Sequence, residues 1–194
     1  AEPLLVKKSF DILNRLDKNK NVLVTTNGTI NVDKFIEYAK DFKYVNIAVS
    51  IEGGKDVNTY IRYPSKWKSI LQNFDKLSKH KNFEVVFNST MNALNVGKFT
   101  KMRKDIAKRK WRVGNIIIGN APWEVSSIPD DVREIYLNDL YEFGEQSIIT
   151  LIENRVYNEK NMIKLMQHCK RRDNLRGTYL PDVFPEWKKY YEET

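Results

Sequence analysis

Val45-Asn46-Ile47-Ala48-Val49-Ser50-Ile51-Glu52-Gly53-Gly54 is typical of a buried β-strand that ends in a tight polar turn. Its apolar, largely β-branched first half is what strands of a helix-covered parallel sheet contain. Ser50 and Glu52 come where this strand ends. Because ligands of open α/β sheets bind beyond the carboxyl ends of the strands, the pattern makes these two side chains candidates for a binding site.

Three other runs have the same design, an apolar strand pattern followed by polar or glycine residues. They are Val22–Thr26 with Asn27 after it, Phe83–Phe87 with Asn88, Thr90 and Asn92, and Val113–Ile118 with Gly119 and Asn120. Amphipathic helix patterns separate the four runs, including about Ser65–Lys79 and Val96–Lys110. The alternation predicts four parallel strands with right-handed crossovers and outer helices.

The remaining segments are predicted from their turn and capping residues. A helix is expected from the first residue through Asp17, and a polar loop that carries Arg62 is expected over Lys55–Pro64. From about Val125 the alternation stops, and three helix patterns follow up to about Arg172. We therefore expect an α/β unit over 1–124 and a helical C-terminal extension over 125–194.

Composition restricts the class of protein. With 194 residues, of which 41% are apolar, the chain is long enough for one core, and no apolar run approaches membrane-spanning length. We expect a cytoplasmic protein. The single cysteine, Cys169, excludes an internal disulfide and any cysteine-ligated cluster built by this chain alone. Neither GxGxxG nor GxxxxGK[ST] occurs, which argues against a dinucleotide or nucleoside triphosphate enzyme.

The net charge of +8 permits two interpretations. Lysines and arginines are densest over Lys98–Arg112, next to Trp111, which suits a nucleic-acid-binding surface. A helix on the outside of a sheet also needs a solvated polar face, and this alternative is favoured.

Several strand ends match one known pattern in order. Glu2-Pro3-Leu4-Leu5 is similar to the end of a Gly-Gly-Glu-Pro motif, Thr25-Thr26-Asn27-Gly28-Thr29 to a Thr-Asn-Gly strand end, and Val49-Ser50-Ile51-Glu52-Gly53 to Ser-Ile-Asp-Gly. In the same pattern an arginine-containing loop and a helix follow the Ser-Ile-Asp-Gly motif, and Arg62 and the helix after it resemble these two elements. Over about Glu2–Pro122 the chain thus resembles the radical S-adenosylmethionine family, in particular phage and environmental bacterial members with a twitch-type extension.

The resemblance implies a partial barrel of parallel strands and a [4Fe-4S] cluster held by a CxxxCxxC loop. The cluster reductively cleaves S-adenosylmethionine to a 5′-deoxyadenosyl radical in this family. The present chain begins inside the Gly-Gly-Glu-Pro motif and has no such loop. We therefore expect the C-terminal part of such an enzyme, inactive by itself and with no cofactor bound to this chain alone. The substrate is not predicted.

The resemblance also assigns roles to the strand-end residues. It implies that the backbone near Glu2 meets the amino group of S-adenosylmethionine, that Ser50 and Glu52 face its ribose or methionine end, and that Gly119 and Asn120 meet adenine. Arg62 either neutralises the carboxylate or anchors its own loop. The other cofactor or substrate candidates are Asn27, Asn88, Thr90 and Asn92, for each of which a turn-forming role is the alternative.

Two expectations concern partners. The missing strands would leave the edge at Val22–Thr26 unpaired, so we expect a second copy, a swapped segment or the C-terminal tail to cover it. The competing function is a nucleic-acid- or protein-binding module that uses the Lys98–Arg112 helix. Binding to a membrane is not expected.

Overall fold

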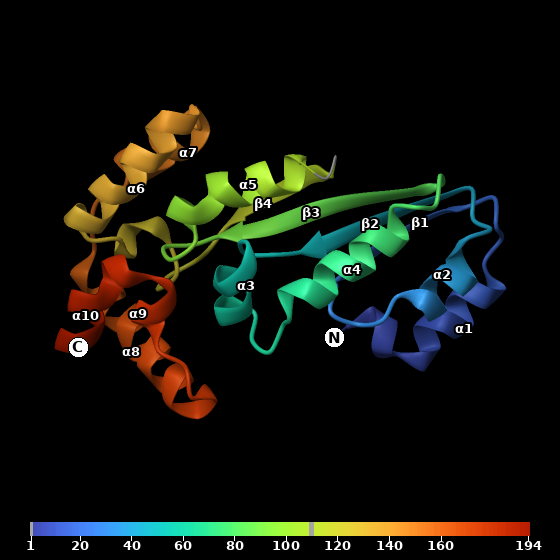
Figure 1. Ribbon diagram of the computed structural model, residues 1–194, viewed down its shortest axis with the longest axis horizontal. Coiled ribbons are helices and arrows are strands. Elements are labelled where there is room, and N and C mark those ends of the chain that lie inside the picture. Colours follow the sequence, from blue (N-terminus) through green and yellow to red (C-terminus); the bar gives the residue numbers. More distant parts are fainter. Residues whose placement is uncertain (1, 109–110) are drawn as a thin grey trace.

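The computed structural model describes residues 2–108 and 111–194, and these form an α/β fold (Figure 1). Four strands make one parallel sheet in the order β1-β2-β3-β4, with β1 at Asn21–Thr26, β2 at Tyr44–Ser50, β3 at Phe83–Met91 and β4 at Arg112–Ile118. Within the described residues β1 and β4 do not pair, so the sheet is open rather than a closed barrel. The predicted parallel α/β architecture is confirmed.

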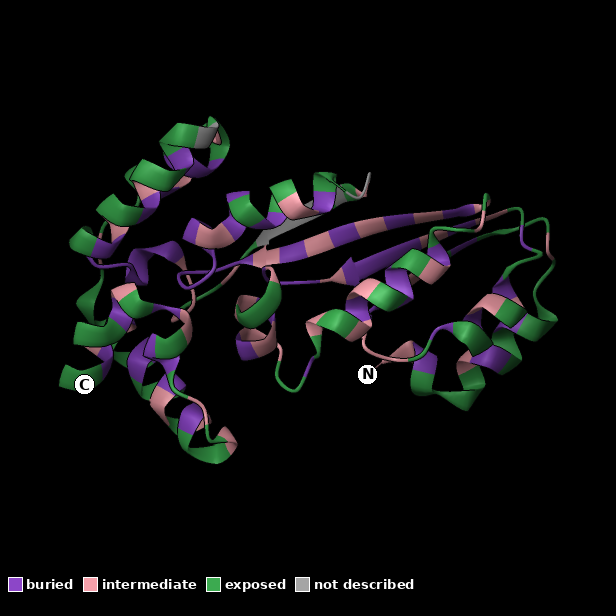
Figure 2. Ribbon diagram, in the orientation of Figure 1, coloured by how far each residue is buried: buried purple, intermediate pink, exposed green. Residues whose placement is uncertain are grey.

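Burial alternates along the strands and so separates two faces of the sheet. On β3, Phe83, Val85 and Phe87 are buried and their neighbours are half-buried, an alternation that Figure 2 shows. On β2, Val45 and Val49 share the face that belongs to the continuous apolar core. Side chains alternate across a strand, so the intervening positions project to the other face.

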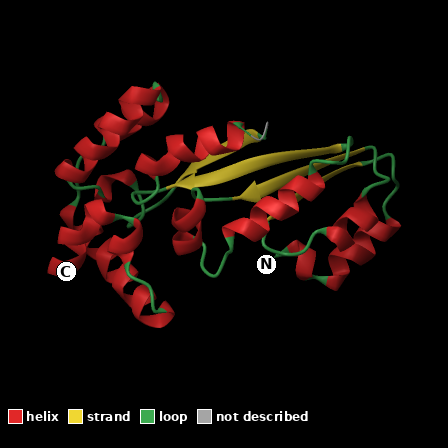
Figure 3. Ribbon diagram, in the orientation of Figure 1, coloured by secondary structure: helices red, strands yellow, loops and turns green. Residues whose placement is uncertain are grey.

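Helices connect the strands (Figure 3). Their bounds are α1 Lys7–Arg15, α2 Asp33–Ala39, α3 Lys55–Ile61, α4 Trp67–Leu77 and α5 Phe99–Ala107, with 3-10 turns η1 at Pro3–Leu5 and η2 at Val96–Lys98. Apolar side chains at helical spacing explain α4, in which Ile70, Phe74 and Leu77 are all buried. Phe74 stacks on Phe87 of β3 with ring centroids 4.4 Å apart.

Three predicted boundaries are wrong. Lys55–Pro64 is not a loop, because Lys55–Ile61 forms α3 and buries Asn58 and Tyr60. Tertiary packing overrides the weak local pattern there. The first α-helix begins only at Lys7, after η1 and the extended residue Val6. Strand β3 continues to Met91, which places Asn88 and Thr90 inside the strand.

The C-terminal extension lies beside the carboxyl ends of the strands in Figure 1. It contains η3 Val125–Ser127, α6 Asp130–Phe143, α7 Gln146–Glu153, α8 Glu159–Arg176, α9 Leu180–Val183, η4 Pro185–Trp187 and α10 Lys188–Glu193. The buried Trp187 indole donates to the Tyr136 hydroxyl at 2.8 Å, and both residues belong to the apolar core that includes the sheet. The extension therefore shares one core with the sheet.

The outer edge of β1 carries no strand in the part of the chain that the structure describes. The C-terminal tail does not cover it, because α10 packs on α8 and α9. That part of the edge prediction is wrong, while coverage by a second copy or a swapped segment stays a prediction. Leu23 in this strand is 71% exposed. Among the described helices, none is long and apolar enough to cross a membrane.

We expect the wild-type chain to associate through the β1 edge, since an unpaired, uncharged strand is a template for pairing. Substitution Leu23→Lys should shift the average mass measured by sedimentation equilibrium towards the monomer, because a lysine on an edge strand opposes pairing. Leu175→Lys, at an equally exposed site on α8, is the matched control and should leave the mass unchanged. A monomeric wild type at every concentration would contradict the expectation.

We expect the extension and the sheet to unfold together because they share a core. Trp187→Ala should lower the free energy of unfolding by about 3–5 kcal/mol, the usual cost of removing a buried aromatic side chain. Ile135→Ala, on the exposed side of α6, should cost less than about 0.5 kcal/mol. Denaturant titrations followed by circular dichroism measure both. Two separate transitions in the wild type would show that the extension is an independent unit.

Candidate functional site

A buried carboxylate organises the carboxyl ends of β2 and β3. Glu52 is only 4% exposed, and Arg62 donates to its Oε1 from Nη2 at 2.6 Å and from Nε at 3.1 Å. The Thr90 amide donates to Oε2 at 2.9 Å, and the Asn95 amide group donates to the same oxygen at 3.3 Å. Glu52 therefore joins the end of β2 to β3 and to the residue that follows α3.

This carboxylate lies beside a pocket of about 500 Å³. The pocket contains six of the ten residues that the sequence nominates, together with residues from α3, the turn after β4 and α8. Its lining is Glu52, Ile61, Arg62, Thr90, Asn92, Gly119, Asn120, Ala121, Trp123 and Arg172. The strand ends of β2, β3 and β4 thus converge on one site, as parallel topology predicts.

The turn after β4 is fixed by backbone hydrogen bonds. The Gly119 amide donates to the Met91 carbonyl at 2.7 Å, and the Trp123 amide donates to the Asn120 carbonyl at 2.8 Å. A Cβ atom on Gly119 would lie 3.2 Å from the Met91 oxygen, tighter than an ordinary contact. Glycine therefore allows the turn to approach the end of β3 and to form one wall of the pocket.

Glu2 and Asn27 are engaged at the end of β1. Glu2 Oε1 accepts from the Thr26 hydroxyl at 2.7 Å, and Oε2 accepts from the Asn27 amide at 2.8 Å. The Asn27 side chain accepts from the Thr29 amide and hydroxyl, which is a turn-forming role. Neither residue lines the pocket at Glu52.

Ser50 and Asn88 also remain outside this pocket. They are register partners on β2 and β3, on the face opposite Val49 and Phe87. Asn92 lines the pocket, but its side-chain oxygen accepts from the Leu94 and Asn95 amides, so a turn-forming role is present there as well.

Sequence reasoning missed Trp123 and Arg172. The Arg172 guanidinium lies 5.4 Å from the centre of the Trp123 ring and donates from Nη2 to the Ile61 carbonyl at 2.8 Å. Trp123 lies three residues after the predicted site residue Asn120, so its place near the end of β4 could have been predicted from the sequence. The place of Arg172 could not, because 110 positions separate it from Arg62 and no periodicity connects the two.

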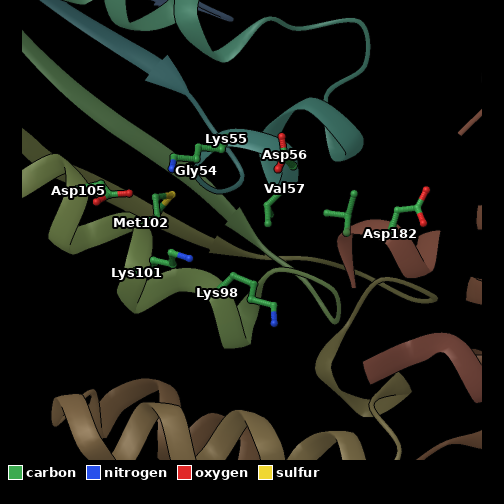
Figure 4. A pocket seen from close by; sticks show the side chains of 10 residues that line it. Gly54, Lys55, Asp56, Val57, Lys98, Lys101, Met102, Asp105 and Asp182 are labelled. Atoms are coloured by element: carbon green, nitrogen blue, oxygen red, sulfur yellow. The ribbon is translucent and has the colours of Figure 1, made fainter. Parts of the chain in front are cut away.

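A second pocket, of about 240 Å³, lies between α3, α5 and α9 (Figure 4). Lysines and aspartates of opposite charge line it, including Lys101 and Asp105 on α5 and Asp182 on α9. Lys98, another of its residues, forms an ion pair with Glu186 at 2.9 Å. None of the nominated residues lines this pocket.

Three cations of the basic stretch Lys98–Arg112 form ion pairs with acidic residues elsewhere in the chain. Arg103 pairs with Glu145 at 2.6 Å, Lys98 with Glu186, and Arg112 with Glu84. Trp111 packs on Phe74 and Phe87 with ring centroids 4.9 and 5.3 Å away. Arg109 and Lys110 lie outside the described residues. These ion pairs and ring contacts use groups that a nucleic acid would otherwise contact, and binding of a nucleic acid by this stretch stays a prediction.

The thiolate ligands of an iron–sulfur cluster are missing from this chain. Its one cysteine is buried, and burial raises the pKa of the Cys169 thiol to about 12. Within the described residues, no group of three or more histidine, cysteine, aspartate or glutamate side chains is placed to hold a metal ion. The donor set therefore does not fit a [4Fe-4S] cluster.

The comparisons with known proteins identify no relative. Neither a family model, nor a curated protein, nor a solved structure matches this chain.

The geometry predicts a pH dependence for Glu52. Burial raises the pKa of its carboxyl above the usual range, and the Arg62 guanidinium opposes this shift. A raised folded-state pKa means that the stabilising contribution is complete below the unfolded pKa of 4.5 and is lost as the pH rises through the folded pKa. The wild type should therefore lose stability relative to Glu52→Gln as the pH rises above 4.5 and through the folded-state pKa.

Denaturant unfolding of both proteins at each pH measures this difference, and a tenfold change in proton affinity corresponds to about 1.4 kcal/mol. Glu134→Gln, on the exposed side of α6, is the control and should show the pH dependence of the wild type. If the wild type instead gains stability over Glu52→Gln with rising pH, the ion pair with Arg62 dominates over burial.

Proposed function

We propose that this chain forms the ligand-binding wall of a radical S-adenosylmethionine enzyme and that the Glu52–Arg62 pocket holds the non-reacting parts of S-adenosylmethionine. The convergence of six nominated residues on one pocket carries the proposal. Five of these residues were chosen from three separate strand ends and Arg62 from the segment that follows α3. Parallel topology alone brings strand ends together, so the support for this family lies in the types and order of these residues.

The pocket offers groups that suit the nucleoside and amino-acid parts of this molecule. Arg62 uses Nε and Nη2 on Glu52, so its Nη1 is the nitrogen available for a carboxylate. The Gly119–Ala121 backbone and the Trp123 ring offer polar and apolar contacts for adenine. Glu52 acts as a positioning residue, because its carboxylate oxygens already accept hydrogen bonds from Arg62, Thr90 and Asn95.

Reductive cleavage to a carbon radical is the chemistry that S-adenosylmethionine supplies in this family. The cluster that it needs does not fit this chain's own donor set, so no reaction step is assigned to these residues. The proposal includes a sheet curved as part of a barrel and a cytoplasmic setting, in which cysteine thiols stay reduced. Cluster thiolates would have to come from another polypeptide segment.

We expect the chain to bind S-adenosylhomocysteine weakly, since the pocket contacts only the non-reacting parts. Ala121→Trp should fill the pocket with an indole and weaken this binding by about tenfold or more, as expected when a ligand contact surface is lost. Isothermal titration calorimetry in phosphate-free buffer measures the affinity.

Ala107→Trp is the matched control, because Ala107 is an exposed alanine on α5 outside this pocket. It should bind as the wild type does. Absence of heat with the wild type, or equal affinity in the Ala121→Trp variant, would refute the assignment of this pocket.

A further inference from the structure

Three arginines gather where α3 ends against α8. Arg62 follows α3 directly, and Arg172 donates to the Ile61 carbonyl at 2.8 Å. Arg176, one turn further along α8, donates to the Tyr60 carbonyl at 3.3 Å and lies 4.9 Å from the centre of the Tyr63 ring. The two α8 guanidinium groups thereby bind the last carbonyls of α3.

The three positive charges have few counter-charges. Arg62 pairs with Glu52, whereas Arg172 and Arg176 form no ion pair within residues 2–108 and 111–194. The nearby Asp173 is buried, and its carboxylate accepts from the Thr178 hydroxyl, the Leu180 amide and the Tyr191 hydroxyl. Carbonyl dipoles compensate a guanidinium charge only in part.

Burial makes this arrangement costly for Arg172. Burial is the largest effect that lowers the pKa of its guanidinium, and the like charge of Arg176 lowers this pKa further. Cations four residues apart on one helix also destabilise that helix. Because Arg172 lines the pocket at Glu52, an anion bound there would supply the missing counter-charge.

We propose that Arg172, supported by Arg176, binds the phosphate group of a phosphomonoester substrate in the pocket next to Arg62. The helical extension thus contributes the substrate-recognition side of the site, and the strand ends contribute the other side. Binding of an anion by Arg172 is independent of the proposed function, whereas the role of this anion as the substrate rests on the proposed function.

A phosphate fits better than a carboxylate. It carries close to two negative charges and three terminal oxygens, which suit two guanidinium groups whose charge the carbonyl dipoles compensate only in part. Thr90 and Asn92 also line the pocket, and both are residues with neutral hydrogen-bonding side chains. A carboxylate would satisfy fewer of these groups.

Protection from phenylglyoxal, a reagent that modifies arginine, tests the site in the unaltered protein. Inorganic phosphate is the probe, and peptide mass spectrometry measures the modification rate at Arg172 and at the exposed Arg171 and Arg155 as internal references. Phosphate at about ten times its dissociation constant should slow modification of Arg172 about tenfold, with little effect on the references. Chloride at equal ionic strength should not protect.

Thermal unfolding gives a second readout. Phosphate should raise the unfolding temperature of the wild type and of Arg171→Gln but not of Arg172→Gln. Equal protection by chloride, protection by acetate but not phosphate, or no protection would each overturn the proposal. The probe contains no nucleoside, so phosphate protection without S-adenosylhomocysteine binding would refute only the proposed function, and the reverse result would refute only this inference.

Discussion

The buried Glu52 carboxyl group is the constraint on which the site depends. Moving a polar group out of water costs several kcal/mol unless its hydrogen-bonding sites are satisfied. Arg62, the Thr90 amide and Asn95 satisfy this one, and they come from different parts of the chain. The ends of β2 and β3 and the end of α3 therefore cannot shift independently. The Gly119 amide donates to the Met91 carbonyl, so the turn after β4 is also held in place against the end of β3.

The sheet departs from the usual parallel pattern in a way that bears on function. Parallel sheets are normally buried on both faces and contain nearly continuous apolar runs. Here one face of β3 is apolar, whereas the other carries Glu84, which binds Tyr44, Asn46 and Arg112. The exposed Leu23 lies outside the apolar core. A polar second face is what a ligand-facing inner surface would require.

The sequence predicted those features that depend on local periodicity. Short apolar, β-branched runs located the strands, and topology then placed Thr90, Asn92, Gly119 and Asn120 around one pocket. It did not predict α3, because that helix is stabilised by burying Asn58 and Tyr60 rather than by a clear apolar stripe.

The role of Glu52 was equally hard to foresee. A glutamate followed by two glycines has the pattern of a solvated turn. Only the tertiary fold shows that the Asn58 side chain accepts from its amide, that Asn95 donates to its carbonyl oxygen, and that its carboxylate is buried. Contacts between residues remote in sequence decide whether such an acid binds a ligand or positions the residues that do.

The position of the helical extension also depends on contacts between residues that are remote in sequence. It shares the apolar core with the sheet, and α8 contacts α3 where Arg172 and Arg176 donate to the Ile61 and Tyr60 carbonyls. Arg172 then reaches the strand ends as a consequence of packing that lies elsewhere in the extension. Arg172 donates to the Ile61 carbonyl next to Arg62, and Arg62 donates to Glu52, so a substitution on α8 can reach the buried carboxyl group through the end of α3. The part of the pocket that α8 lines and the part that the strand ends line are thus joined through the end of α3.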